Sequence, residues 1–114
     1  MKILVIEDSV RLADTIAEAL QNENYVVDTA NDGQLGYEHA STGIYDMVIL
    51  DLMLPKMNGY EVLSALRRDG DNVPVLILSA KTEIDDKIQG FTTGADDYMT
   101  KPFEIRELLM RIQA

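Results

Sequence analysis

Asp51 is a carboxylate that stands inside an apolar stretch of the chain, VILDLMLP at residues 48–55. Burying a carboxylate costs several kcal/mol unless a partner compensates its charge, and that cost approaches the whole stability of a small domain. Four further residues have chemically useful side chains: Glu7, Asp8 and Ser79 also follow apolar runs, and Lys101 lies in YMTKPF. The chemistry of these side chains suggests why a carboxylate stands at position 51.

Together these residues supply the groups needed to form an aspartyl-phosphate: a carboxylate nucleophile, acidic metal ligands, a lysine and a hydroxyl. Three carboxylates that converge would raise one another's pKa unless a cation neutralises them. Oxygen ligands without histidine or cysteine select a hard ion, and Mg²⁺ prefers a few carboxylates together with water and phosphate. Lys101 would bind phosphate as a mobile point charge, and the Ser79 hydroxyl would donate a hydrogen bond.

Each of these residues, taken alone, also has an ordinary structural interpretation. An aspartate at the end of a strand is commonly a turn or helix-cap residue. The Glu7-Asp8 pair before a helix can act as a cap that interacts with the helix dipole. The hypothesis of a phosphorylation site therefore depends on all five residues lying at the same edge of one sheet.

Three short and almost entirely apolar runs indicate strands that are buried on both faces, as in a parallel sheet. They are KILVIE (2–7), MVILDL (47–52) and VPVLIL (73–78), with YVVDTA (25–30) and GADDYM (94–99) as weaker candidates. The intervals between them have helical periodicity. Its apolar stripes are Leu12, Ile16, Ala19 and Leu20; Ile84, Ile88 and Phe91; and Ile105, Leu108, Leu109 and Ile112. Asn58-Gly59 can begin another helix, and the segment from Gly33 to Thr42 is the weakest helix candidate because it contains Gly36.

Strands that alternate with helices in this way predict a doubly wound parallel α/β domain with right-handed crossovers. Ligands in such domains bind beyond the carboxyl ends of the strands, at the topological switch point. Glu7 and Asp8 end the first predicted strand, Asp51 the third and Ser79 the fourth, and Lys101 follows the fifth. If the first and third strands are neighbours, the three carboxylates converge at this edge.

The composition limits the classes of protein to which the chain can belong. At 114 residues it is expected to form one domain, and 46% hydrophobic with 26% charged residues is ordinary for a globular protein. No apolar run has the length of a membrane helix, no signal peptide is recognisable, and the absence of cysteine suits a reducing cytoplasm. A net charge of −10 would repel a phosphate backbone, so this segment by itself is not expected to bind DNA. The chain ends in RELLMRIQA, within a helical pattern, and the natural protein is expected to continue.

The motifs IEDS, VILDLMLPKMNGYEVL, LILSA and GADDYMTKPF resemble the receiver domain of bacterial two-component response regulators, from Met1 to the end of the chain. The resemblance implies a flavodoxin-like (CheY-like) doubly wound (βα)5 fold with a five-stranded parallel sheet in the order 2-1-3-4-5. It also implies that Asp51 accepts a phosphoryl group from the phosphohistidine of a sensor histidine kinase. Such a domain is a signalling phosphoacceptor that catalyses only its own phosphorylation and dephosphorylation, and it is not an enzyme for external substrates.

The same resemblance assigns roles to the other site residues. Mg²⁺ or Mn²⁺ would be held by Glu7, Asp8, Asp51 and the backbone carbonyl of Met53. Ser79 would be the switch hydroxyl, Lys101 the phosphate-binding lysine and Tyr98 the switch aromatic residue. The Lys101-Pro102 peptide bond is expected to be cis. The exposed face of the first helix is expected to select the kinase, through Arg11, Asp14, Thr15 and Glu18.

The pattern GADDY-M-TKPF, followed by EL and Arg111 in this chain, is similar to the OmpR/PhoB subfamily of response regulators. That similarity implies a receiver domain at residues 1–114 and a winged-helix DNA-binding domain after it, in a cytoplasmic regulator of transcription. It also implies a phosphorylation-dependent homodimer built from the fourth helix, fifth strand and fifth helix. The expected pairs across its two-fold axis are Lys87 with Glu107 and Asp97 with Arg111.

Three alternatives follow from the same residues. A metal-dependent aspartyl-phosphate phosphatase of the haloacid-dehalogenase type needs a second acid two residues after the nucleophile, where this chain has Met53. A flavodoxin-like cofactor binder needs a hydroxyl- and glycine-rich phosphate loop, whereas the loop here is the acidic EDSVR. A degenerate receiver that acts only as a scaffold would not need the complete set of five site residues.

Overall fold

The structure is a computed structural model that describes residues 1–80 and 84–114. Within these residues five strands alternate with five helices. The strands are β1 (Lys2–Ile6), β2 (Val26–Ala30), β3 (Met47–Leu50), β4 (Val75–Ser79) and β5 (Asp97–Thr100). The helices are α1 (Val10–Asn22), α2 (Gly33–Ala40), α3 (Gly59–Arg68), α4 (Ile84–Thr93) and α5 (Ile105–Gln113).

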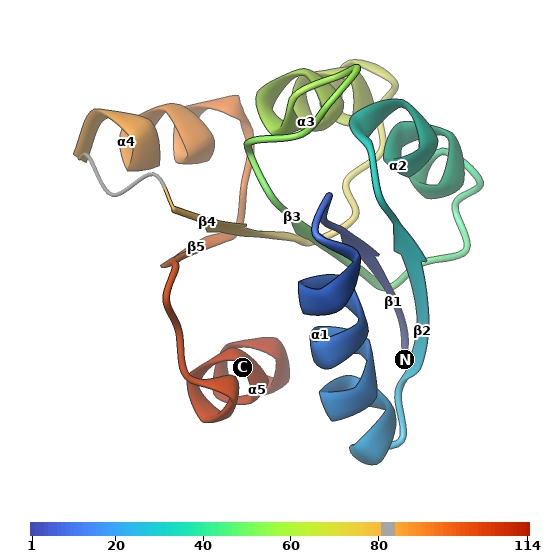
Figure 1. The fold of residues 1–114 in the computed structure, drawn as a ribbon. Coiled ribbons are helices and arrows are strands. Elements are labelled where there is room, and N and C mark those ends of the chain that lie inside the picture. Colours follow the sequence, from blue (N-terminus) through green and yellow to red (C-terminus); the bar gives the residue numbers. More distant parts are fainter. Residues whose placement is uncertain (81–83) are drawn as a thin grey trace.

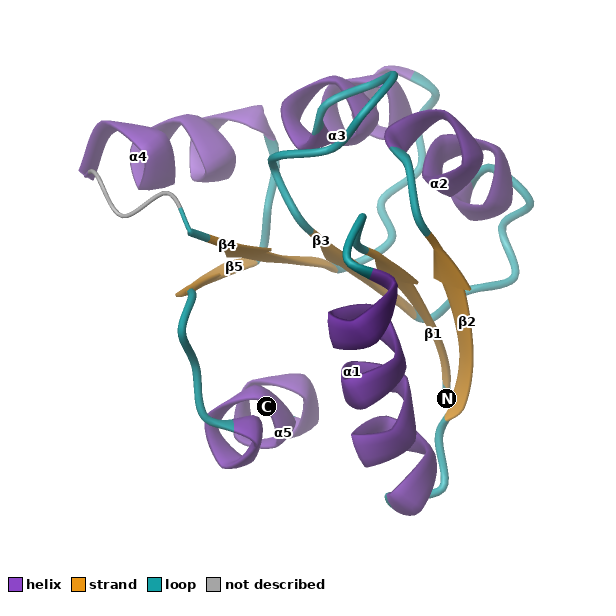
Figure 2. Ribbon diagram, in the orientation of Figure 1, coloured by secondary structure: helices purple, strands orange, loops and turns teal. Residues whose placement is uncertain are grey.

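The strands form one parallel sheet in the order β2-β1-β3-β4-β5. Helices α1 and α5 cover one face of the sheet, and α2, α3 and α4 cover the other (Figure 1; Figure 2). The predicted fold and strand order are confirmed. Because β1 lies between β2 and β3, the chain changes direction across the sheet at the β1/β3 pair, which is the topological switch point.

Two hydrophobic clusters, one on each face, explain the continuous apolar runs of the inner strands. Along β1, Ile3 and Val5 belong to the cluster under α1 and α5, whereas Leu4 and Ile6 belong to the cluster under α2 and α3. Successive side chains of a strand point to opposite faces, so a strand buried on both sides must be apolar at every position. In β3, likewise, Ile49 belongs to the cluster under α1 and α5, and Leu50 belongs to the cluster under α2 and α3.

The helix starts follow local signals in the sequence. The Ser9 side chain caps α1 by accepting from the amide of Leu12, and the Asp32 side chain caps α2. Asn58 caps α3 in a capping box with Glu61, which satisfies two amides that a helix start leaves unpaired. The prediction of a helix start at Asn58-Gly59 is therefore confirmed.

Gly36, the residue that weakened the prediction of α2, is needed for packing. A Cβ at this position would lie 2.6 Å from the side chain of Ile6, so the glycine lets α2 approach β1 closely. The helix forms as predicted and ends at Ala40, two residues earlier than expected. A low helix propensity is outweighed here by burial against the sheet.

Two expectations need correction. The apolar stripe predicted on α4 does not face the core throughout, because the side chains of Ile88 and Phe91 are 56% and 49% exposed; that of Ile84 lies outside the described side chains. The fifth strand begins at Asp97 and not at Gly94, which has a φ of +124°, a value far from extended backbone. No helix among the described residues combines the length and hydropathy that a membrane span requires.

Candidate functional site

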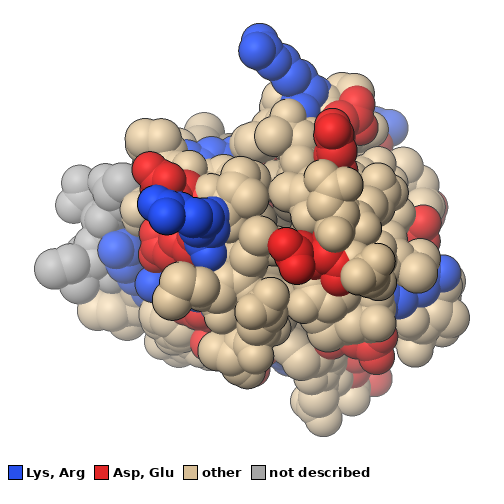
Figure 3. Space-filling view, turned by 90° about the horizontal axis from the view of Figure 1, so that it is seen from below, with Lys and Arg blue, Asp and Glu red and all other residues tan. Residues whose placement is uncertain are grey.

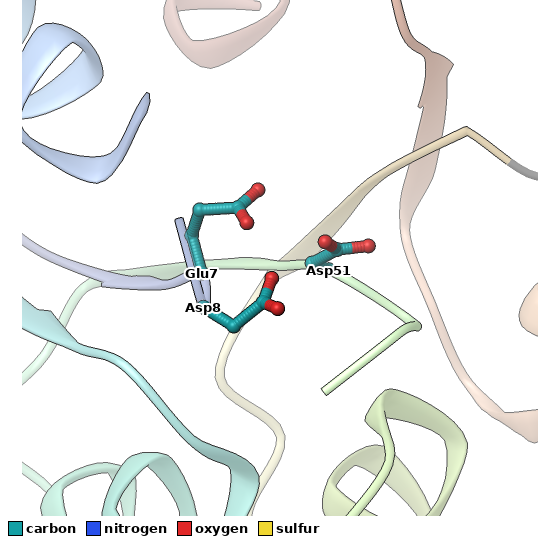
Figure 4. A group of neighbouring side chains, drawn as sticks. All are labelled: Glu7, Asp8 and Asp51. Atoms are coloured by element: carbon teal, nitrogen blue, oxygen red, sulfur yellow. The ribbon is translucent and has the colours of Figure 1, made fainter. Parts of the chain in front are cut away.

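Three carboxylates converge where β1 and β3 end. Because these strands are neighbours in register, with Ile6 beside Leu50, the residues that follow them leave the sheet side by side. Glu7, Asp8 and Asp51 each offer a carboxylate oxygen within 4.8 Å of the others. Figure 4 shows these three side chains at the ends of the two strands. Glu7 and Asp51 are almost fully buried, whereas Asp8 is exposed. The predicted convergence of the acidic residues is confirmed.

Lys101 follows β5, the edge strand two positions beyond β3, and its side chain reaches this cluster. Its amide donates to the carbonyl of Ser79, which continues the β4–β5 ladder by one residue. Its Nζ donates to Glu7 Oε1 at 2.6 Å and to Asp51 Oδ2 at 3.0 Å. The Lys101-Pro102 bond is cis, as expected. One ammonium group therefore bridges a carboxylate from each of the two central strand ends.

The charges at the site are not balanced. Burial raises the pKa of Glu7, and the hydrogen bond from Lys101 offsets this effect only in part. Burial lowers the pKa of Lys101, but its bonds to Glu7 and Asp51 outweigh that effect and leave its pKa raised, so the lysine is charged at neutral pH. Among the described residues, three carboxylates against one ammonium group leave an excess of negative charge, which a divalent cation would neutralise.

The loop after β3 is held by α3. The amide of Gly59 donates to the carbonyl of Leu52, and a Cβ on Gly59 would lie 2.3 Å from the carbonyl oxygen of Asp51. Glycine at the first position of α3 is thus required for the helix to approach the backbone beside Asp51. The amide of Met53 donates to Asp51 Oδ1 at 3.2 Å, and its side chain is 60% exposed.

Ser79 and Tyr98 lie on the two strands beyond β3. Ser79 is fully buried at the end of β4. Tyr98 is opposite Ile77 in the ladder between β4 and β5 and is 7% exposed, so the structure holds its ring in the inward position. The ring packs under α4 near Gly90, and Lys87 Nζ lies 5.9 Å from the ring centroid.

The side chains predicted to select the kinase are exposed, and those predicted to form the dimer are exposed or half-buried. Four side chains of α1 face outward, namely Arg11, Asp14, Thr15 and Glu18. On the other surface Arg111 donates to Asp97 at 2.8 Å and to Glu107 at 3.1 Å within the same chain. Figure 3 shows the side of the molecule with α1 and α5, where basic side chains lie against acidic ones near one edge.

Sequence reasoning missed one residue beside the site. Asn31 follows β2 and donates from Nδ2 to the backbone carbonyl of Glu7 at 3.0 Å. The signal was present, because Asn31-Asp32-Gly33 is a turn sequence that ends the strand next to β1. It identified the start of α2 but not the contact with the acidic loop.

Comparison with known proteins gives the family. The family model described as "Response regulator receiver domain" matches residues 3–113. The chain is 48% identical over 113 residues to the transcriptional regulatory protein DltR of Streptococcus agalactiae, covering 99% of this chain and 50% of that protein. It is 48% identical over 114 residues to CiaR of Streptococcus pneumoniae, again covering 50% of that protein. The chain thus spans about half the length of the curated relatives it matches.

Solved structures agree with this result. The receiver domain of the Francisella response regulator 1452 superposes with a TM-score of 0.94 at 37% identity, covering 98% of this chain and 93% of that one. The chemotaxis response regulator CheY4 of Vibrio cholerae superposes with a TM-score of 0.91 at 32% identity, covering 98% and 95%. These likenesses favour a receiver over a phosphatase or a cofactor binder. The chain belongs to the response regulator receiver domain family of two-component systems, and the regulators it matches are of the OmpR/PhoB type.

Proposed function

We propose that Asp51 is the phosphoacceptor of this receiver domain and takes a phosphoryl group from the phosphohistidine of a sensor histidine kinase. The observation that carries this proposal is the Lys101 ammonium group, which bridges Glu7 and Asp51 beside the exposed carboxylate of Asp8. Asp51 Oδ1 or Oδ2 attacks the phosphorus, the bond between phosphorus and the imidazole nitrogen breaks, and the imidazole keeps the electron pair. Lys101 then donates to the oxygens of the transferred group.

The donor set fits Mg²⁺ or Mn²⁺. Glu7, Asp8 and Asp51 offer oxygens only, which hard divalent ions prefer, and the carbonyl of Met53 would be a further ligand. When bound, the ion neutralises negative charge on the phosphoryl oxygens, which lowers the repulsion between the incoming group and the carboxylates. The chain's own part is to hold the attacking oxygen and the lysine in place.

Incubation with acetyl phosphate and Mg²⁺, followed by intact-mass measurement, tests this assignment. The parent should gain the mass of one phosphoryl group, and both Asp51→Asn and addition of EDTA should abolish the gain. Asp46→Asn is a matched control, because Asp46 precedes β3 at the opposite end from Asp51. Full labelling of Asp51→Asn would exclude Asp51 as the acceptor.

The exposed face of α1 is proposed to select the kinase. Arg11, Asp14, Thr15 and Glu18 present charges of both signs next to the acidic loop, which suits recognition by charge complementarity. Exchanging these four residues should redirect phosphotransfer between kinases while labelling by acetyl phosphate continues. Unchanged kinase preference after the exchange would count against this surface.

Signal transmission is proposed to pass from Asp51 to Ser79 and Tyr98. A phosphoryl group on Asp51 offers the buried Ser79 hydroxyl a strong acceptor, which would draw the loop after β4 inward; residues 81–83 of that loop lie outside the described residues. Phosphorylation would then favour the inward position of Tyr98 over an outward one, as a shift between two existing states. Ser79→Ala should accept the phosphoryl group but leave the NMR signals of Tyr98 unchanged on labelling, in contrast to the parent.

The switched domain is proposed to form a two-fold dimer through α4, β5 and α5. Arg111 already pairs with Asp97 and Glu107 within one chain. An ion pair of Arg111 with the other subunit would therefore replace an existing ion pair and add little energy. Exposed ion pairs contribute only about 0–1 kcal/mol each. The exposed apolar side chains of Ile88 and Phe91 must therefore supply much of the association energy, with Lys87 and Glu107 setting the orientation.

Sedimentation of the phosphorylated protein tests the dimer. A Lys87→Glu, Arg111→Glu double variant should stay monomeric, and one that dimerises like the parent would exclude this interface. The winged-helix DNA-binding domain after residue 114, the cytoplasmic location and the control of transcription remain predictions. They are supported by relatives that are transcriptional regulators about twice as long as this chain.

A further inference from the structure

Asn31 extends the β1–β2 ladder beyond the end of both strands. The amide of Glu7 donates to the carbonyl of Ala30, and the carbonyl of Glu7 accepts from the side-chain amide of Asn31 at 3.0 Å. Both backbone polar groups of Glu7 are therefore fixed to the end of β2. Without the Asn31 amide, the peptide between Glu7 and Asp8 would lose its donor and its restraint.

The turn that contains Asn31 is itself anchored to the loop after β3. The amide of Gly33 donates to the carbonyl of Pro55 at 3.2 Å, and a Cβ on Gly33 would lie 1.6 Å from the carbonyl oxygen of Met57. Asp32 caps α2 and lies 3.7 Å from Lys56 Nζ. The same three-residue turn thus contacts the loop that carries Glu7 and Asp8 and the loop that follows Asp51.

We propose that Asn31 is a positioning residue for the divalent-cation site: its amide holds the Glu7 carbonyl so that the Glu7 and Asp8 carboxylates keep their places relative to Asp51. This inference rests on the proposed function, because it assigns a role in holding the cation. Asp8 is exposed, so few contacts other than the backbone fix its direction. A loop that must become ordered when the ion binds lowers the affinity for that ion.

Direct titration with Mg²⁺ tests the role separately from phosphorylation. Asn31→Ala should raise the Mg²⁺ dissociation constant by about tenfold, which is the low end of what outer-sphere partners of metal ligands contribute to affinity. At saturating Mg²⁺ the rate of labelling by acetyl phosphate should stay within about twofold of the parent, because Asn31 touches neither Asp51 nor the phosphoryl group. Asn72→Ala, an exposed asparagine before β4 at the opposite edge of the sheet, is the matched control and should bind Mg²⁺ like the parent.

Amide hydrogen exchange separates positioning from a general loss of stability. In Asn31→Ala the amides of Glu7, Asp8 and Ser9 should exchange faster, while those of β4 keep the protection of the parent. Equal loss of protection across the sheet, or parent-like Mg²⁺ binding by Asn31→Ala, would overturn this inference alone. A parent protein that binds no Mg²⁺ would refute the proposed function, and the inference with it.

Discussion

Replacing Glu7 by glutamine removes one of the three converging carboxylates and keeps the shape of the side chain. Glutamine can still accept from the amide of Ser9, as Glu7 Oε2 does at 3.0 Å, but its NH₂ group then replaces the oxygen that accepts from Lys101 at 2.6 Å, so that hydrogen bond is lost. We expect Glu7→Gln to be more stable than the parent without divalent cations and to lose most of the stabilisation by Mg²⁺. The two effects have opposite signs, so one variant tests both the electrostatics and the cation site.

The magnitude follows from one contact distance and from the upper limit on the separation of the carboxylates. With an effective dielectric constant of about 20, the 2.6 Å contact between Glu7 and Lys101 is worth about 6 kcal/mol of attraction. The buried carboxylate of Asp51, within 4.8 Å, repels Glu7 by at least about 3 kcal/mol, and the exposed Asp8 adds about 1 kcal/mol. These Coulomb terms leave a net attraction of about 2 kcal/mol, which is smaller than the several kcal/mol that desolvating a carboxylate costs. Glu7→Gln should therefore raise the free energy of unfolding by about 1–2 kcal/mol.

The pH dependence has a defined sign. Burial raises the pKa of Glu7 above its usual value despite the lysine, so the folded state binds the Glu7 proton more tightly than the unfolded chain does. Ionised Glu7 then lowers stability at any pH above its folded pKa, and this loss is absent below the pKa of the unfolded chain. The advantage of Glu7→Gln should be largest at neutral pH and should disappear as the solution becomes acidic.

Urea unfolding followed by circular dichroism measures these quantities in EDTA and in MgCl₂. Mg²⁺ at a hundred times its dissociation constant should stabilise the parent by about 2.7 kcal/mol and the variant far less, which reverses their order. Glu18→Gln, on the exposed face of α1, is the control and should follow the parent in both buffers. If Glu7→Gln is clearly less stable than the parent in EDTA, the ion pair with Lys101 outweighs burial and this reasoning is wrong.

Three further predictions concern the capping, packing and electrostatics of the fold outside the site. Asn58→Ala removes the cap of α3 and should lower the free energy of unfolding by about 1 kcal/mol in urea, with little change in the m-value. Gly36→Ala would place a Cβ 2.6 Å from Ile6 and should cost about 1–3 kcal/mol in the same assay; a neutral effect would show that α2 moves away from β1 easily. Burial and the hydrogen bond to Asp28 raise the pKa of Tyr45 to about 12, so Asp28→Asn should lower the pKa of Tyr45 in an alkaline absorbance titration, with Tyr45→Phe identifying the signal.

The parts of the fold that local sequence determines were predicted well. The runs that form β1, β3 and β4 are apolar at successive positions because two helical layers cover them, and few other folds of a chain of this size produce that pattern. The place of Asp51 at the end of β3 follows from the same run, since its charge interrupts the run where the strand ends. The cap at Asn58 is equally local, because its partner Glu61 is three residues away.

Features that depend on distant contacts could not be predicted from pattern. Ile88 and Phe91 fit a helical stripe, but which side of α4 faces the sheet depends on Gly90, whose missing side chain lets the helix approach Ile77 and Tyr98. The contact of Asn31 with Glu7 joins residues 24 positions apart, and only the neighbouring positions of β1 and β2 bring them together. Both depend on the strand order, which the spacing of apolar residues does not determine.

The strand order also explains why the site carries an excess of negative charge. Glu7 and Asp51 end adjacent strands and are buried there, while Lys101 comes from β5, two strands beyond β3, and reaches them only through its long side chain. Among the residues that the structure describes, a further ammonium group in contact with these carboxylates would reduce the excess charge and favour the fold, but it would occupy the space that a cation and a phosphoryl group require. The excess charge therefore opposes folding and favours binding of a divalent cation at the same time. Stability and affinity at this site have a common origin, and each substitution of Glu7 must change both.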